Sequence, residues 1–341
     1  MYYFCKKKLQ FMKLQNIITF ITVLVMLLAC TQEKKNRDYT LEGPIFGTSY
    51  KIKYYNTNIN FQKSLDSLFL LVNTSTSTYS SESDISKINN GDSTIIVDAI
   101  FSEVFEKSKR IYKETDGFFD PTVGNLVNAY GFGPKNEKKD LTDAEIKEQM
   151  KFVGLEKITL KNSKVLKEDP KVYLDFNSIA KGFAIDVIAR FFDQKKIENY
   201  LIEIGGEIRA KGFKKNNKPW LIRIVNPVNS YDNNGFKTIN LSNKAMATSG
   251  NYRKFRISSE GKKYVHTINP KTGYATESNL LSASVISNKD CADLDAYATA
   301  FMAMGLEKTK EFLIKNPSIK VILLFSSKSG IIEEYATYNY N

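Results

Sequence analysis

Residues 178–191 read Ser178-Ile179-Ala180-Lys181-Gly182-Phe183-Ala184-Ile185-Asp186-Val187-Ile188-Ala189-Arg190-Phe191. Apolar side chains recur at helical spacing along this stretch and form one face, made of Ile179, Ala180, Phe183, Ala184, Val187, Ile188 and Phe191. Ser178 can accept a hydrogen bond from the first turn and so cap the helix. The pattern predicts an amphipathic helix whose apolar face packs on a core.

Short strands punctuated by glycine follow this helix, and further strands and helices surround it. Strands are expected at 45–55, 157–160, 172–175, 201–204, 220–225, 236–241, 253–258, 263–268, 281–286 and 321–325. Helices are expected at 61–72, 97–115, 291–304 and 306–314, with a helix start at 142–145, a short helix inside the glycine-rich segment 118–133 and a loop at 73–83. A sheet in the middle with helices outside indicates an α+β or mixed α/β fold.

The N-terminus carries an export signal. Residues 13–30 start with a lysine, continue as an apolar run and end in Leu27-Leu28-Ala29-Cys30. The apolar run is short for a membrane-spanning helix and stops at a small residue before cysteine, which predicts a lipoprotein signal peptide at 1–29, lipidation of Cys30 and a tether at 30–42. A retained N-terminal anchor is the alternative, and Met12 is a second candidate start. Both interpretations place the domain outside the cytoplasm, lipid-anchored or anchored to a bacterial membrane.

Charge and cysteine content narrow the class of protein. The net charge is +12, and four of those charges (Lys6, Lys7, Lys8, Lys13) lie in the signal, which leaves about +8 without a lysine or arginine block. Such a surplus suits an anionic ligand or an anionic membrane surface, and export makes nucleic acid an improbable partner. Cys5 falls in the signal and Cys30 takes the lipid, so Cys291 is left without a disulfide partner and stability must come from a core.

A carboxylate and a hydroxyl lie four residues apart in the expected helix 291–304. Residues at i and i+4 share one helical face, so Asp295 and Thr299 can hold one hard cation such as Mg²⁺ between them. The alternative is a surface acid beside a small residue on a buried face.

The single histidine of the chain, His266, lies at the end of an expected strand. It precedes a turn built by Asn269-Pro270-Lys271-Thr272-Gly273. A side chain at such a place can reach into a cleft, and imidazole can take a proton from an attacking hydroxyl near neutral pH. A structural, hydrogen-bonded histidine is the alternative.

Three further segments are candidates for phosphate contact. Asp175 precedes the helix 178–191 and Lys181 lies in its first turn, where free N–H groups and the helix dipole attract anions; an ordinary capped helix with a solvated lysine is the alternative. Thr248 and Ser249 are polar enough to contact phosphate. The glycine pair in Glu203-Ile204-Gly205-Gly206-Glu207-Ile208 indicates a hairpin turn or a close approach to a ligand.

Together these segments have the order of a known family. They run Phe-Gly-Thr (46–48), Ser-Thr-Tyr (77–79), Asp-Ile-Ser-Lys-Ile-Asn (84–89), Asp-Pro-Thr-Val-Gly-Asn-Leu-Val-Asn-Ala-Tyr-Gly-Phe-Gly (120–133), Asp-x-x-x-Ile-Ala-Lys-Gly (175–182), Gly-Gly-Glu-Ile (205–208), Ala-Thr-Ser-Gly-Asn-Tyr (247–252), His-x-Ile-Asn-Pro-Lys-Thr-Gly (266–273) and Asp-Ala-x-Ala-Thr-Ala (295–300). The chain resembles the ApbE family of FAD:protein FMN transferases over residues 43–335, which would form one FAD-binding domain.

The resemblance implies a T-fold-like α+β architecture that binds FAD as substrate with Mg²⁺. It implies transfer of FMN through a phosphoester bond to a threonine or serine of a target flavoprotein of a membrane or exported electron-transfer system, with release of AMP. By position, His266 would be the catalytic histidine. The implied metal ligands are Asp295, Thr299 and the backbone carbonyl of Ser178; the implied FAD contacts are Asp175, Lys181, Phe46, Tyr79, Ala129, Tyr130 and Gly131.

Other activities fit the same residues. The same site with water as nucleophile would be an FAD pyrophosphatase that gives FMN and AMP. A non-catalytic FAD-binding lipoprotein and a general nutrient-binding lipoprotein are the alternatives without chemistry.

Overall fold

The structure, a computed structural model, describes residues 37–134, 140–227, 236–251, 255–257, 263–275 and 278–338. The chain divides into two compact units, 1–37 and 38–341, and all described residues except Arg37 belong to the second unit. The predicted signal peptide, Cys30 and residues 30–36 of the predicted tether lie outside the described residues. Within the described ranges, no helix is both long and apolar enough to cross a membrane.

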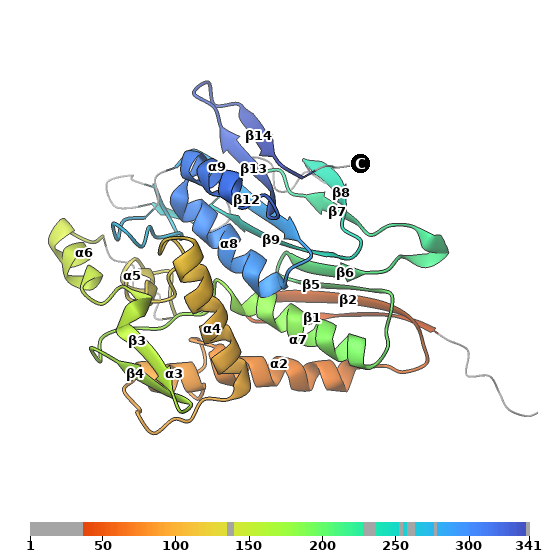
Figure 1. Cartoon of the computed structure of the whole chain (residues 1–341), viewed down its shortest axis with the longest axis horizontal. Coiled ribbons are helices and arrows are strands. Elements are labelled where there is room, and N and C mark those ends of the chain that lie inside the picture. The colour runs from red at the N-terminus through yellow and green to blue at the C-terminus, as the bar shows by residue number, and fades with distance from the viewer. Residues whose placement is uncertain are drawn as a thin grey trace, which may run out of the picture. The chain divides into compact units, whose positions relative to one another are not determined.

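One eight-stranded sheet forms the centre of the molecule (Figure 1), in the order β1-β2-β5-β6-β9-β12-β13-β14. Its strands are β1 (Arg37–Ile45), β2 (Thr48–Thr57), β5 (Tyr200–Ile204), β6 (Glu207–Lys211), β9 (Lys244–Gly250), β12 (Leu280–Ser287), β13 (Lys320–Ser326) and β14 (Ile332–Ala336). Neighbours from β2 to β14 pair antiparallel. Three two-stranded sheets accompany it: β3 (Ile158–Lys161) with β4 (Lys164–Lys167), β7 (Leu221–Ile224) with β8 (Lys237–Asn240), and β10 (Phe255–Ile257) with β11 (Lys263–Val265).

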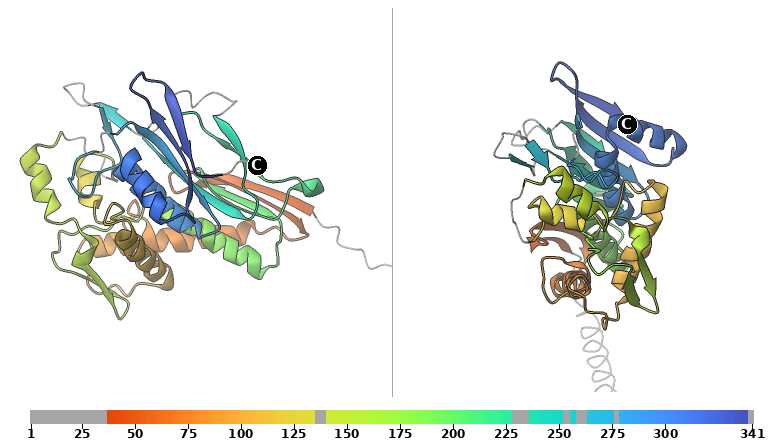
Figure 2. Two further views of the ribbon diagram at one scale, coloured as in Figure 1. Left: turned by 45° about the horizontal axis from the view of Figure 1, so that its top comes forward. Right: turned by 90° about the vertical axis from the view of Figure 1, so that its left-hand side faces the viewer.

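Among the helices of the described residues, the longer ones cover one face of the large sheet, and the short ones lie in the segments beside it. They are α2 (Gln62–Thr76), α3 (Asp84–Asn89), α4 (Ala99–Glu114), α5 (Gly124–Ala129), α6 (Asp143–Met150), α7 (Ala180–Gln194), α8 (Cys291–Met304) and α9 (Leu306–Lys315). Helices α7 and α8 lie directly on the central strands, and α2 and α4 pack outside them (Figure 2). Successive side chains of β5 point to two different hydrophobic cores. Ile202 and Ile204 pack in the large core with the helices, whereas Leu201 packs in a smaller core formed with β7 and β8.

The fold class and most elements predicted from the sequence are confirmed. The architecture is α+β with antiparallel sheets, α8 has the predicted bounds, and the amphipathic helix forms as α7. Gly205 and Gly206 form the turn between β5 and β6 with φ values of +63° and +107°, which explains the glycine pair. Cys291 is buried as a free thiol.

Two of the predicted strands differ from the structure. Residues 172–175 form no strand, since Tyr173 makes only an isolated bridge and the side chain of Asn89 pairs with the backbone of Leu174; β3 pairs instead with β4, which the sequence pattern did not predict. The sequence pattern also did not predict strands β1, β9 and β14. The single strand expected at 45–55 is interrupted by a turn at Phe46 and Gly47, and the sheet takes in residues 37–42, which the sequence places in the tether.

Helix α2 runs four residues beyond its predicted end, into the segment predicted as a loop at 73–83. The predicted cap at Ser178 is also wrong. Helix α7 begins at Ala180, with Ile179 at the N-cap position. The Ile179 side chain makes no capping hydrogen bond. The acceptor comes instead from a distant part of the chain.

Helices α7 and α8 cap each other. Asp295 of α8 accepts a hydrogen bond from the N–H of Gly182 at 3.1 Å. Asp186 of α7 accepts the N–H groups of Cys291 and Ala292, both at 2.9 Å. Each carboxylate thus satisfies first-turn donors of the other helix and faces the positive end of its dipole. This arrangement fixes the crossing of the two helices at their N-terminal ends.

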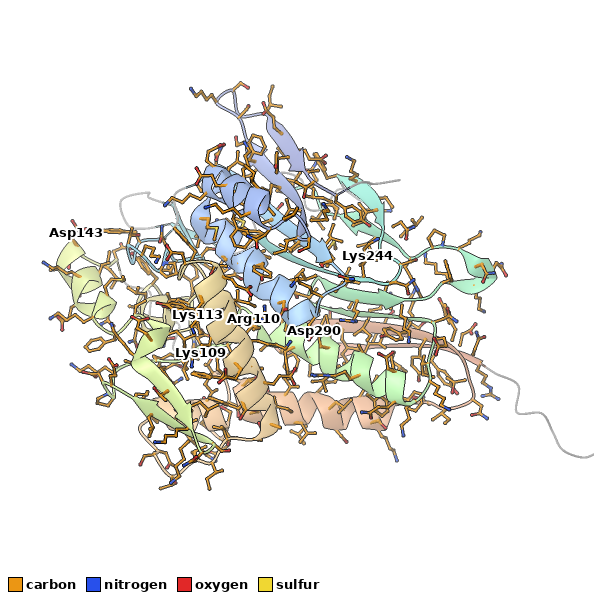
Figure 3. All side chains as sticks on the ribbon, viewed as in Figure 1. Lys109, Arg110, Lys113, Asp143, Lys244 and Asp290 are labelled. Carbon is orange, nitrogen blue, oxygen red and sulfur yellow. The ribbon has the colours of Figure 1, made fainter. Side chains whose placement is uncertain are left out.

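A set of ion pairs fastens the outer helix α4 to the start of α8. Lys107 lies 2.6 Å from Asp290, and Arg110 lies 2.6 Å from Asp293. Figure 3 shows Arg110 on α4 beside the end of α8 that carries Asp290. Asp293 therefore faces α4, on a different side of α8 from Asp295, whose contact is with α7.

The helix crossing requires glycine at position 182. A Cβ atom there would lie 2.4 Å from the carbonyl oxygen of Cys291 and 2.6 Å from its carbon, and backbone cannot give way as a flexible side chain can. We expect Gly182→Ala to lower the free energy of unfolding by about 3 kcal/mol, because overpacking forces the helices apart.

Urea denaturation of the full chain measures this effect, with Gly330→Ala as the matched control. Gly330 has φ +82° and no heavy atom within 4 Å of an added Cβ, so its replacement costs only backbone strain of about 1 kcal/mol. Equal losses in the two variants would contradict the close contact at Gly182.

Candidate functional site

Three ionisable side chains meet where α7, α8 and the β5–β6 turn come together. The Lys181 ammonium lies 3.5 Å from Glu207 Oε1 and 3.7 Å from Asp295 Oδ2. Both carboxylates are buried. Glu207 Oε2 is buried without a hydrogen-bond partner. A buried carboxylate oxygen without a partner favours a cation beside it.

The pKa values in this cluster follow from burial and from the mixed charges. Burial raises the pKa of Glu207 to about 8, against the opposing effect of Lys181. Burial alone would lower the pKa of Lys181, but the carboxylates of Asp295 and Glu207 outweigh it and raise that pKa. Lys181 is therefore a permanent positive charge at the start of α7.

Hydroxyl groups extend the cluster along α8 and β9. Thr299 lies one helical turn after Asp295, and its hydroxyl is 3.3 Å from that of Ser249 on β9. Thr248, the preceding residue, pairs instead with Ser284 of β12 at 2.8 Å. Ser249 thus joins the predicted metal ligands, whereas the Thr248 hydroxyl is engaged within the sheet.

The backbone at the start of α7 offers a further oxygen. A regular helix would direct the N–H of Gly182 to the carbonyl of Ser178, four residues earlier. That N–H donates to Asp295 instead, and none of the hydrogen bonds among the described residues ends on the Ser178 carbonyl. Among the described residues, the Ser178 carbonyl is thus left without a backbone donor, four residues before the N–H group that Asp295 accepts.

Asp175 organises the loop that leads into α7. Its side chain accepts the N–H of Asn177 at 2.8 Å, its own N–H donates to the carbonyl of Pro121, and burial raises its pKa. The Asn177 side chain donates to the hydroxyl of Thr78. Desolvation of the Tyr79 hydroxyl and the negative charge of Asp175 raise the pKa of Tyr79. Tyr79 is 62% exposed, so its ring is accessible beside this loop.

Helix α5 connects the Asp175 loop to the histidine turn. Its first residue, Gly124, would place a Cβ atom 3.1 Å from that of Asp175. The helix ends at Ala129, and Tyr130 and Gly131 follow it. Tyr130 is buried in a small core with Ile268 of the histidine turn. The Tyr130 ring is thus a packing element and not an accessible platform for a flat ligand.

His266 follows β11 directly and is partly exposed. The predicted turn after it is confirmed, with the N–H of Gly273 donating to the carbonyl of Asn269 at 2.8 Å. The Phe132 ring lies edge-on to the imidazole, with 6.4 Å between centroids. The next residue, Thr267, donates to the side chain of Asn251 at 2.9 Å, and Asn251 follows Ser249 by two residues. The histidine is therefore tied to the strand that carries Ser249.

Phe46 lies in the turn between β1 and β2 with φ +48°, packed edge-on against Phe69 of α2. That turn neighbours the β5–β6 turn: a Cβ atom on Gly205 would lie 2.9 Å from Thr48 and 3.4 Å from Lys181 Cδ. Phe46 thus belongs to the same rim as Lys181. A separate groove of about 570 Å³ lies between β1 and α2, lined by Ile45, Tyr50, Phe69 and Leu70 among others, and contains none of the predicted site residues.

The structure therefore brings Lys181, Ser178, Ser249, Asp295 and Thr299 together and places Phe46, Asp175, Tyr79 and His266 on segments attached to them. Sequence reasoning assigned no role to Glu207; the available signal was an acid immediately after a glycine turn. In the part of the chain that is described, no three His, Cys, Asp or Glu side chains are grouped so as to hold a metal. A cation here would need hydroxyl, carbonyl, water or substrate oxygens as well.

Comparison with known proteins gives one family. The model of the ApbE family matches residues 46–323. A Haemophilus influenzae protein called FAD:protein FMN transferase is 34% identical over 94% of this chain and 95% of its own length. The flavin transferase ApbE from Vibrio cholerae has a TM-score of 0.78 at 35% identity, over 88% of this chain and 97% of that structure. The flavinyl transferase ApbE of Pseudomonas stutzeri, in its apo form, has a TM-score of 0.79 at 25% identity, over 88% and 95%.

Proposed function

Because this chain belongs to the ApbE family, we propose that it is an FAD:protein FMN transferase. The observation that carries the proposal is the convergence of Lys181, Asp295, Thr299 and Ser249 at the start of α7, with His266 tied to the same strand through Asn251. A site of this kind joins charge neutralisation for a diphosphate to a base for an attacking hydroxyl.

The residues present fit a hard divalent cation such as Mg²⁺. The donors are all oxygen: the Asp295 carboxylate, the Thr299 and Ser249 hydroxyls and the Ser178 carbonyl. The orphaned oxygen of Glu207 also favours a cation. When bound, the ion would neutralise charge on the FAD diphosphate and make its phosphorus more electrophilic.

The chain's own residues supply the other parts of the transfer. Lys181 places a point charge beside the diphosphate, and the exposed ring of Tyr79 and the Phe46 turn border the space for the flavin and adenine. His266 accepts the proton of a threonine or serine hydroxyl of the target. The new bond joins that oxygen to the phosphorus of the FMN half, the bridging P–O bond breaks, and AMP leaves.

The target is proposed to be an exported or membrane-bound electron-transfer flavoprotein. The sequence prediction of a lipidated Cys30 supports this, because a lipid would anchor the enzyme to a bacterial membrane outside the cytoplasm, at the periplasmic face or at the cell surface.

The test is an assay with the full chain in detergent, FAD, Mg²⁺ and a target protein that carries an Asp/Ser/Thr-Gly-Ala-Thr-like segment. We expect the mass of FMN on the target and an equal amount of AMP. Both should disappear with EDTA and return with excess Mg²⁺, and replacing the acceptor threonine by valine should abolish the adduct. Free FMN and AMP without an adduct would indicate a pyrophosphatase, and no AMP with any divalent metal would indicate a binding protein.

A further inference from the structure

Glu207 has no role in the transfer as described, yet it is the most conspicuous polar group of the cluster. Its side chain is 3% exposed, and one of its two oxygens has no hydrogen-bond partner. An ionised carboxylate in such a place costs free energy unless a cation compensates it. The nearest cation among the described residues is the Lys181 ammonium, 3.5 Å from Oε1.

The β5–β6 turn shapes the path of the Lys181 side chain along its length. At Gly205 a Cβ atom would come within 3.4 Å of Lys181 Cδ, so the aliphatic stem lies against a position without a side chain. Two residues later, Glu207 meets the ammonium at the end of that stem. The β5–β6 turn therefore provides both the space for the aliphatic part of Lys181, at Gly205, and the carboxylate that contacts its ammonium, at Glu207.

Asp295 competes for the same ammonium. Its Oδ2 lies 3.7 Å from Lys181 Nζ and also accepts the Gly182 N–H. If Asp295 binds a cation, its attraction for Lys181 weakens, and Glu207 is then the carboxylate left to hold the ammonium in place.

We propose that Glu207 is a positioning residue for Lys181: it keeps the ammonium at the diphosphate site and away from Asp295 when that carboxylate binds a cation. The inference rests on the proposed function, since it assumes that Lys181 contacts the FAD diphosphate. Without Glu207, Lys181 would pair with Asp295 alone, where it would compete with the incoming cation, and once the cation is bound no carboxylate would hold the ammonium at the phosphate.

The experiment is a double-mutant cycle on the affinity for FAD, measured by flavin fluorescence with the full chain and Mg²⁺. We expect the Kd to rise about tenfold in Glu207→Gln and about tenfold in Lys181→Met. The Kd of the double variant should also rise about tenfold, because both changes remove the same interaction. Glu207→Asp, which keeps the charge, should recover most of the affinity.

Riboflavin, which lacks both phosphates, separates positioning from damage to the site. Its affinity should be the same in all four proteins. A rise of about a hundredfold in the double variant, the product of two independent losses, would overturn the inference, as would a parallel loss of riboflavin affinity in Glu207→Gln. A wild-type protein that binds no FAD would contradict the proposed function itself and is recognised before any variant is made.

Discussion

Replacing Asp295 by asparagine is expected to lower kcat/KM for FMN transfer by about a thousandfold or more. The amide keeps the size of the side chain and can still accept the Gly182 N–H, so the helix crossing is retained. What is lost is the negative charge that faces Lys181 and, in the proposed site, the cation. Initial rates of adduct formation at several Mg²⁺ concentrations measure the effect, and excess Mg²⁺ should recover only part of the rate.

Asp293→Asn is the matched control for this variant. Asp293 is a buried carboxylate on the same helix, but its partners are Arg110 and Lys107 of α4. Loss of those ion pairs should reduce stability by about 1 kcal/mol, since the Arg110 side chain is 39% exposed to water and keeps Glu114 as a partner. The rate per folded molecule should stay within about threefold of wild type. If Asp295→Asn retains a tenth of the activity, or if both variants lose activity equally, the assignment of Asp295 is wrong.

Replacing His266 by asparagine is expected to lower kcat by about a hundred- to ten-thousandfold, the usual contribution of a general base. The affinity for FAD should change by less than about threefold, because the charged groups proposed to hold the diphosphate, Lys181 and Asp295, lie on other segments and keep their mutual contacts. The acid limb of the wild-type pH profile should disappear in the variant, since it would report protonation of the imidazole.

Tyr274→Phe tests whether any change in the histidine turn has the same result. The Tyr274 hydroxyl donates to Asp143 of α6 at 2.7 Å and so braces the turn from the side of that helix. We expect its kcat to stay within about threefold of wild type. Loss of FAD affinity in His266→Asn, or an unchanged pH profile, would remove the histidine from the role of base.

The sequence predicted those elements whose signals are local. Helix α8 has its predicted bounds because an apolar, alanine-rich run ends at Gly305, which takes φ +75°. The capping box of Thr142 and Glu145 starts α6 as predicted. The β5–β6 turn follows from two adjacent glycines.

Elements defined by distant partners could not be predicted in this way. Strand β9 reads Lys-Ala-Met-Ala-Thr-Ser-Gly, a composition with weak strand preference, and it is a strand because β6 and β12 flank it. The extended segment 172–175 pairs with the side chain of Asn89 and not with a second strand. The acceptor at the start of α7 is Asp295, more than a hundred residues away, so the local sequence pointed to Ser178.

The same limit applies to the site. Spacing along one helix made Asp295 and Thr299 candidate metal ligands, and a lone imidazole before a turn made His266 a candidate base. Ser249 was a candidate for phosphate contact, but its closeness to Thr299 depends on how β9 packs on α8. A role for Glu207 could not be predicted from the sequence, because it depends on the position of the β5–β6 turn beside Lys181.

The mutual capping of α7 and α8 has a consequence for how ligands bind. Asp295 uses one oxygen, Oδ2, for the Gly182 N–H, so its position and orientation are set before any ion arrives. Binding of an ion would then require little rearrangement of the backbone, because the entropic cost of ordering this carboxylate was incurred during folding. In the proposed site, a metal ion would therefore meet a carboxylate that the helix crossing already holds in position.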